Sequence, residues 1–223
     1  MPASTLHNGP KNARRYDVIG VYSEPSESFV RHVGLYSPEG GTLSYDEEVD
    51  VTHMGPPLKR SGKATAHVIG TVPLTNEEVK EIGSWIEEVD DEYRRVGVAK
   101  PEQQYCIHPP WRDEVDKNTG ARRYRRYSCA GFVLCAYGEV RIRLLDVEQP
   151  DLPDVEEQTV LNAYPRLYPL LRGHPDRLDG LGLEGTPPWR IVLAGYLFHA
   201  LNRPTDQIRG GPYRVRPGDE TFP

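Results

Sequence analysis

The chain has 223 residues and a formal net charge of −6 at pH 7. Hydrophobic residues make up 37% of it, and 21 glycines and 21 prolines indicate a folded chain with many turns and long loops. The acidic balance argues against a dedicated nucleic-acid-binding surface. The three cysteines include no CxxC pair, which argues against a disulfide framework or a tetrahedral zinc site, and we expect neither a metal nor a cofactor.

The first residues carry no sign of a secretory signal. Residues 1–15 lack a basic start followed by an apolar core, and we expect them to form a flexible leader. A bilayer-spanning helix needs about 20 apolar residues, whereas the longest apolar run, 189–201, is shorter and contains Arg190 and His199. We therefore expect a cytoplasmic protein without a transmembrane segment.

Short strands are predicted in the first part of the chain. Alternating and β-branched apolar residues indicate strands over 16–22, 29–36 and 49–53, and a further strand over 64–72. Segments rich in glycine, proline and polar residues separate them, so the pattern predicts a meander.

The clearest helix follows these strands. Thr75 and Glu78 have the spacing of a capping box, in which each side chain accepts a hydrogen bond from the backbone N–H of the other. From Val79 to Val96, apolar residues recur at spacings of three and four. This period predicts an amphipathic helix that packs on one side.

A second, apolar helix is predicted to begin at Cys129. Ser128 is a good N-cap residue, and Gly138 fits the left-handed position that ends a helix. Unpaired backbone N–H groups in the first turn stabilise an anion, so we expect the Cys129 thiol to ionise below its ordinary pKa of about 8.5. Since the thiolate is the nucleophile, Cys129 is a candidate catalytic residue; the alternative is an inert, buried cysteine.

Four arginines stand just before this helix, within residues 122–127. Their alternation with tyrosines fits two roles: a grip on an anionic or single-stranded nucleic-acid partner, or a strand edge protected by charge. We favour the strand edge and expect no nucleic-acid partner.

Residues 146–223 are expected to form a helical extension that packs on the preceding domain. Just before it, 140–145 indicate a strand; within it, 155–163 indicate a short helix and 204–223 an irregular tail. The run 189–201 is apolar nearly all round, which suits a buried helix or one that faces a protein partner. A protein partner at this helix is therefore one interpretation.

Two histidines complete the candidate site. A cysteine nucleophile needs a histidine to accept its proton and a third polar group to orient that histidine. His32 lies in the second predicted strand and His53 ends a later one, so both could lie at one end of a sheet with the helix of Cys129 against it. A structural histidine pair and a metal-dependent hydrolase that uses both rings are the alternatives.

The motifs around these residues resemble a known family. They are Asp-Val-Ile-Gly-Val at 17–21, His-Val-Gly-Leu-Tyr at 32–36, Val-Thr-His-Met-Gly-Pro-Pro at 51–57 and Cys-Ala-Gly-Phe-Val at 129–133. Their order is similar to that in the lecithin:retinol acyltransferase-like proteins. These belong to the circularly permuted branch of the NlpC-type papain-fold cysteine enzymes, in which the histidine strand precedes the cysteine helix. The resemblance covers residues 16–138.

Position by position, the resemblance implies that His32 is the general base, His53 the orienting histidine and Cys129 the nucleophile. His53 follows His32 by 21 residues, more than the usual separation in the family. Either the segment between them carries an insertion, or Ser44 or Asp46 takes the third position. We favour His53, because its Pro-Pro context matches the family pattern.

These features together predict an α+β chain. Residues 16–145 would form a permuted papain-like, NlpC-type domain, with an antiparallel sheet packed on the nucleophile helix, and 146–223 the extension. Cys129 would attack the carbonyl carbon of an amide or ester substrate, and its own backbone N–H with Tyr124 or Tyr127 would stabilise the negative oxygen. The predicted activity is that of a cysteine hydrolase (amidase, peptidase or esterase). An acyltransferase acting on lipid or amine acceptors and a non-catalytic binding module are the alternatives.

Overall fold

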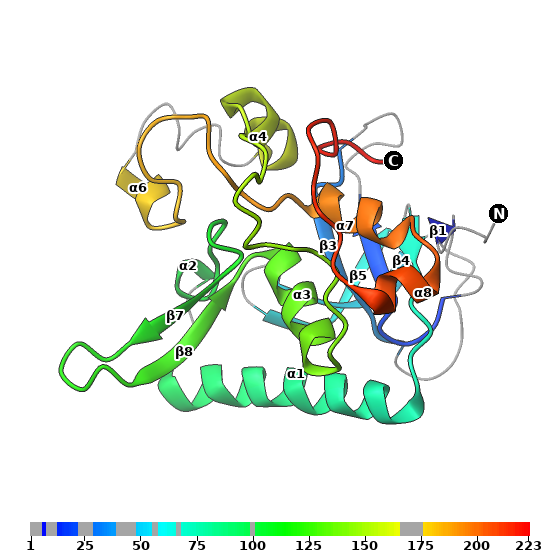
Figure 1. The fold of residues 1–223 in the computed structure, drawn as a ribbon. Coiled ribbons are helices and arrows are strands. Elements are labelled where there is room, and N and C mark those ends of the chain that lie inside the picture. Colours follow the sequence, from blue (N-terminus) through cyan, green and yellow to red (C-terminus); the bar gives the residue numbers. More distant parts are fainter. Residues whose placement is uncertain are drawn as a thin grey trace.

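The computed structural model describes residues 6–7, 13–21, 29–38, 48–54, 58–65, 68–98, 101–165 and 176–223. Within these residues the chain combines an antiparallel sheet, a separate two-stranded ribbon and helices that pack against the sheet (Figure 1). The α+β class predicted from the sequence is therefore confirmed. In the same residues no helix has both the length and the apolar character needed to cross a bilayer.

The main sheet has the strand order β1-β6-β2-β3-β4-β5 in the described part of the chain, and each neighbouring pair is antiparallel. Its strands are β1 (Leu6–His7), β2 (Val18–Val21), β3 (His32–Tyr36), β4 (Glu48–Met54), β5 (Leu58–Thr65) and β6 (Val68–Gly70). The first three predicted strands correspond to β2, β3 and β4. Most of β5 was not predicted, and the single strand expected over 64–72 corresponds instead to the end of β5 and to the short strand β6. β1 lies in the expected leader, 1–15, and pairs with β6.

The two faces of the sheet belong to different parts of the core, because side chains alternate along a strand. Val33 and Leu35 of β3 join the large core cluster, which includes residues of α3 (Cys129–Glu139) and α7 (Ala194–Leu201). Tyr36 belongs to a second, smaller cluster. Helices α3 and α7 therefore cover the same face of the sheet (Figure 1).

Helix α7 approaches the sheet closely, because two glycines leave room for it. A Cβ atom at Gly20 of β2 would lie 2.7 Å from Phe198 Cζ, and one at Gly70 of β6 would lie 2.5 Å from Leu201 Cδ1. Nearly all of α7 is buried within the chain. The helix is apolar because it packs on the sheet, which corrects the interpretation of residues 189–201 as a surface for a protein partner.

Helix α1 (Asn76–Val96) has the capping box predicted from the sequence. The Thr75 hydroxyl accepts a hydrogen bond from the backbone N–H of Glu78, and the Glu78 carboxylate accepts one from the backbone N–H of Thr75. Arg209 of α8 (Thr205–Gly210) also donates to this carboxylate, and its hydrogen bond lowers the pKa of Glu78 to about 2. The segment expected to be an irregular tail thus contains a helix that binds α1.

The arginine-rich segment forms one strand of the separate ribbon. β7 (Trp111–Val115) pairs antiparallel with β8 (Arg122–Tyr127), and the ribbon extends away from the sheet in Figure 1. Arg125 binds a carboxylate of β7 with N–O distances of 2.6 and 3.0 Å, and Arg122 binds Glu92 of α1 at 2.7 Å. These pairs use the arginines within the fold and support the strand-edge interpretation.

The C-terminal extension packs on the rest of the chain in the residues that the structure describes. Its helices there are α4 (Glu157–Ala163), α6 (Asp176–Asp179), α7 and α8, while a short helix α2 (Pro101–Gln104) precedes the ribbon. One core cluster contains residues from both sides of position 145. The strand expected over 140–145 is reduced to an isolated bridge at Leu145. The extension therefore shares its core with the sheet.

The segment that carries Pro110 packs against the first turn of α3, and Gly131 in that turn leaves room for it. The Pro110 carbonyl oxygen accepts a hydrogen bond from the Ser128 backbone N–H at 2.8 Å. A Cβ atom at Gly131 would lie 1.7 Å from the same oxygen, so a larger residue could not fit without movement of the backbone. Gly138 lies inside the helix, which ends at Glu139 rather than at a left-handed glycine as the sequence suggested.

Gly131→Ala should lower the free energy of unfolding by about 3 kcal/mol, because the new methyl group overlaps a backbone carbonyl oxygen. Gly138→Ala, in the same helix with nothing within 4 Å of its Cβ position, is the matched control. It should raise the free energy of unfolding by about 0.5–1 kcal/mol. Urea unfolding of both variants and the parent measures the two changes. A Gly131→Ala chain as stable as the parent would contradict the contact with Pro110.

Candidate functional site

Cys129 is the first residue of α3 and is completely buried. Ser128 caps the helix, because its hydroxyl accepts a hydrogen bond from the Gly131 backbone N–H at 2.9 Å. The helix packs against β3 and β4, the two strands that carry the predicted histidines. The predicted start of the helix is therefore confirmed.

Four groups that can donate hydrogen bonds favour a negative charge on the Cys129 sulfur. They are the Tyr105 hydroxyl and the backbone N–H groups of Val33, Ala130 and Cys129 itself. Burial has the largest effect and raises the pKa of the thiol above its ordinary value, while these four groups oppose the rise. The expectation of an easily ionised thiol is therefore wrong, because the donors at the start of the helix do not offset the loss of water.

His32 and His53 form a direct pair. His32 Nε2 lies 2.8 Å from His53 Nδ1, and the two rings meet edge to face with their centroids 4.7 Å apart. They come from β3 and β4, which are neighbours in the sheet. Because this contact uses His32 Nε2, an exchange of protons with a thiol would run through His32 Nδ1. Ser44 and Asp46, the alternatives for the third position, lie outside the described residues.

The His32 ring and helix α3, which carries the thiol, lie on opposite faces of β3. Alternation along β3 places His32 on the face of Gly34, where a Cβ atom would lie 2.8 Å from His53 Cβ, and Val33 on the face covered by α3. The Val33 N–H, one of the groups that favour a negative sulfur, belongs to the peptide that follows His32. Among the described residues no hydrogen bond joins the Cys129 sulfur to either ring. The structure therefore joins His32 to His53 and places Cys129 beside the backbone of β3.

Two tyrosines that the sequence did not indicate interact electrostatically with the Cys129 thiol. The Tyr105 hydroxyl lowers the pKa of the thiol, and Cys129 in turn contributes to the raised pKa of Tyr164, whose hydroxyl is buried. Tyr124 and Tyr127, which the sequence suggested as donors, instead pack against aromatic side chains of α1. The donors at the site therefore come from other segments than the one we expected.

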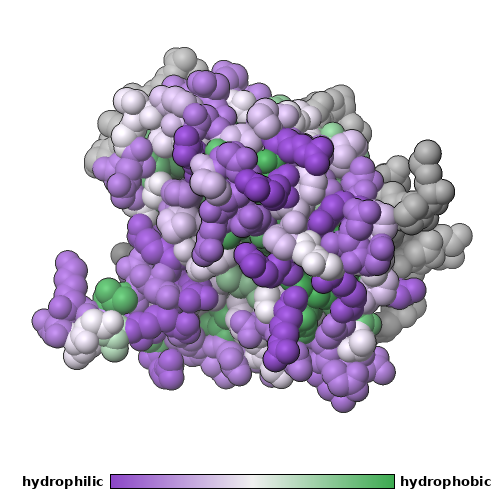
Figure 2. Space-filling model, viewed as in Figure 1, coloured by the Kyte–Doolittle hydropathy of each residue, from purple (hydrophilic) through white to green (hydrophobic). Residues whose placement is uncertain are grey.

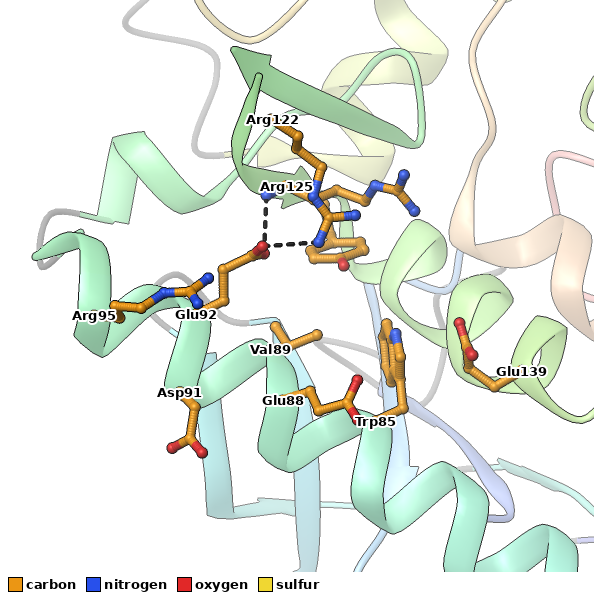
Figure 3. A pocket seen from close by; sticks show the side chains of 10 residues that line it. Trp85, Glu88, Val89, Asp91, Glu92, Arg95, Arg122, Arg125 and Glu139 are labelled. Atoms are coloured by element: carbon orange, nitrogen blue, oxygen red, sulfur yellow. Dashed lines mark hydrogen bonds and ion pairs between the residues drawn. The ribbon is translucent and has the colours of Figure 1, made fainter. Parts of the chain in front are cut away.

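A groove of about 610 Å³ opens between α1, β8 and the end of α3 (Figure 3). Glu92 reaches across it and accepts hydrogen bonds from the Arg122 guanidinium and the Arg125 backbone N–H. Hydrophilic side chains dominate this side of the molecule in Figure 2. The lining residues that the structure describes include neither Cys129 nor the histidine pair, so the groove is separate from the candidate site.

Comparison with family models, with curated proteins and with solved structures finds no match. The resemblance of residues 16–138 to the lecithin:retinol acyltransferase-like proteins therefore stays a prediction. Within the described ranges, no group of three or more histidine, cysteine, aspartate or glutamate side chains is arranged to hold a metal ion. The metal-dependent alternative thus gains no support from the histidine pair.

Alkylation of Cys129 by iodoacetamide should have a pH midpoint above the ordinary thiol pKa of about 8.5, because burial favours the neutral thiol. Tyr105→Phe should raise the midpoint further, since the change removes a donor to the sulfur. Both chains would carry Cys106→Ala and Cys135→Ala, so that one thiol is followed by mass spectrometry.

The same shift of pKa affects folding. Because the unfolded chain loses the thiol proton first, the free energy of unfolding should fall as the pH rises above the ordinary thiol pKa. An alkylation midpoint below that ordinary value, or one that Tyr105→Phe leaves unchanged, would contradict this description of the sulfur.

Proposed function

We propose that this chain is a thiol-dependent hydrolase, an amidase, peptidase or esterase, that works through an acyl-enzyme at Cys129. One observation carries the proposal. Helix α3, which begins with Cys129, packs against β3 and β4, and the His32 ring on β3 is held by His53 on β4. A nucleophile, a base and an orienting group are the parts that acyl transfer to sulfur requires.

A permuted papain-like, NlpC-type fold accommodates these parts. The histidine strands β3 and β4 precede the cysteine helix along the chain, and α3 packs against both strands. The sheet beneath the helix is antiparallel, as expected for that fold. The proposal therefore includes this fold for residues 16–145, with residues 146–223 packed on it.

The reaction begins with a neutral thiol, because burial raises the pKa of Cys129. His32 Nδ1 takes the thiol proton as the sulfur attacks the carbonyl carbon, and the carbonyl π electrons move to the oxygen. The bond to the amine or alcohol then breaks, and this group leaves with the proton from His32, which yields a thioester. Water attacks the thioester, again giving a proton to His32, which returns it to the sulfur as the acid departs. In the resting enzyme, His53 holds the His32 ring.

Proton transfer requires the His32 ring to reach the sulfur around the start of β3. His32 is the first residue of that strand and is only partly buried, unlike the fully buried Val33 and Leu35 that follow. Its side chain is therefore less constrained by packing than those within the strand. We assign the described arrangement, in which the His32 ring contacts His53, to the resting enzyme.

Two other functions use the same scaffold. An acyltransferase would differ in the second step, where an amine or a lipid hydroxyl replaces water as the acceptor. A non-catalytic binding module is favoured by one observation, the complete burial of Cys129, because a buried neutral thiol reacts slowly. An assay of acyl transfer from an activated ester to the sulfur distinguishes these functions. Both enzymes should accept the acyl group, whereas the binding module should not.

Cys129→Ala should abolish formation of an acyl-enzyme with p-nitrophenyl acetate, because the attacking sulfur is lost. Cys135→Ala is the matched control, since Cys135 lies later in the same helix, and it should be acetylated like the parent. Release of p-nitrophenol and mass spectrometry of the modified residue measure the step. Full acyl-enzyme formation by Cys129→Ala would refute the proposal, and a parent chain in which Cys129 is never acetylated would favour the binding module.

His32→Ala and His53→Ala should separate the base from its orienting partner. His32→Ala should slow acetylation by a factor of about 10²–10⁴, because no group then takes the thiol proton. His53→Ala should slow it less, because the His32 ring still accepts a proton when it is not held. Alkylation of Cys129 at high pH should persist in both variants, where hydroxide forms the thiolate. His53→Ala with the rate of the parent would return the third position to Ser44 or Asp46.

A further inference from the structure

The groove between α1, β8 and the end of α3 takes no part in the proposed reaction, and its lining suits a ligand of its own (Figure 3). We propose that it binds a basic side chain of a peptide partner, with the cationic group held against the Trp85 ring between the carboxylates of Glu88 and Glu139. The inference is independent of any chemistry at Cys129.

Trp85 supplies an aromatic surface to the groove. Its ring meets the Tyr127 ring edge to face, with centroids 5.8 Å apart, and lies 5.1 Å from the Phe132 ring, so packing fixes its orientation. The side chain is only partly buried, and it lines the groove. The π system of an indole attracts a cation within about 6 Å of its centre. A fixed, partly open ring is therefore available to a cationic group.

Two carboxylates flank this ring. Glu88 lies three residues after Trp85 and shares its face of α1, while Glu139 ends α3, which packs against α1. Both side chains are exposed and line the groove, and Figure 3 shows Trp85 between them. Neither carboxylate has a hydrogen bond or an ion pair among the described residues. Their negative charges remain for a ligand to match.

The arginines that line the groove on β8 do not match these charges, because each already binds another carboxylate. Arg122 donates a hydrogen bond to Glu92 at 2.7 Å, and Arg125 donates two to Asp113 at 2.6 and 3.0 Å. Both guanidinium groups are thus neutralised within the fold. The part of the groove beside Trp85 is therefore complementary in charge to a cation.

Arg95 marks the opposite end of the groove. It lies two helical turns beyond Glu88, about 10 Å along α1, and has no ion pair in the described part of the chain. A positive charge there repels a cation, so the cationic group belongs at the Trp85 end. The groove, at about 610 Å³, is far larger than an ammonium or guanidinium group. We assign the remaining space to the backbone of a peptide.

The first test compares two pentapeptides, blocked at both ends, in which four glycines flank one lysine or one norleucine. Norleucine keeps the hydrocarbon chain of lysine and lacks the ammonium group. NMR titration of the full chain, followed at the indole N–H of Trp85, measures both dissociation constants. At low ionic strength the lysine peptide should bind about 10-fold more tightly, because the norleucine peptide has no cation for the ring and the carboxylates.

The second test alters the charges of the groove. Glu88→Gln combined with Glu139→Gln should weaken binding of the lysine peptide about 10-fold. Glu77→Gln combined with Glu81→Gln is the matched control, since it changes the net charge equally at exposed positions of α1 outside the groove lining. This control should keep the affinity of the parent. Arg95→Gln should strengthen binding, because it removes a positive charge.

Several outcomes would overturn the proposal. Among them are no measurable binding of the lysine peptide, equally tight binding of the norleucine peptide, and an equal loss of affinity in the two double variants. Weaker binding by Arg95→Gln would indicate an anionic ligand instead. If butylammonium binds as tightly as the lysine peptide, the ligand is a free amine and the peptide partner is refuted. Because no readout involves acetylation of Cys129, failure of the proposed function would leave these results unaffected.

Discussion

The hydrogen bond from the Ser128 backbone N–H to the Pro110 carbonyl oxygen fixes where α3 begins. Because Gly131 has no side chain, the segment that carries Pro110 approaches the first turn more closely than a Cβ atom would allow. This contact sets the position of Cys129 relative to β3, against which α3 packs. Every chemical role suggested for the sulfur depends on that position.

Two opposing electrostatic effects act on this sulfur. Donors at the start of α3 favour a negative charge, but removal from water disfavours it more, and the thiol is neutral at rest. A neutral resting thiol resists oxidation and unwanted alkylation, since both proceed through the thiolate. Under the proposed function such a thiol requires a base, and the His32–His53 pair would supply it. The burial that argues for an inert cysteine is thus also compatible with a guarded nucleophile.

Local signals in the sequence predicted the starts of α1 and α3, because the caps at Thr75 and Ser128 depend on residues only a few positions away. The electrostatic interactions of Tyr105 and Tyr164 with the thiol had no such signal. Tyr105 reaches the site through a bridge to Tyr127, and Tyr164 through the packing of the extension, so both depend on contacts distant in sequence. The burial of the thiol, which reverses its expected pKa shift, also depends on contacts between residues distant in sequence. No local periodicity of the sequence indicates it.

The close packing of α7 over Gly20 and Gly70 ties the extension to the sheet energetically. The apolar face that this helix covers would be exposed to water without it, so the sheet and the extension gain their stability in one cooperative transition. A substitution at Phe198 or Leu201 therefore lowers the population of molecules with an assembled site, although neither residue belongs to that site. Abundance in a cell would respond to such a change as strongly as to one beside the sulfur.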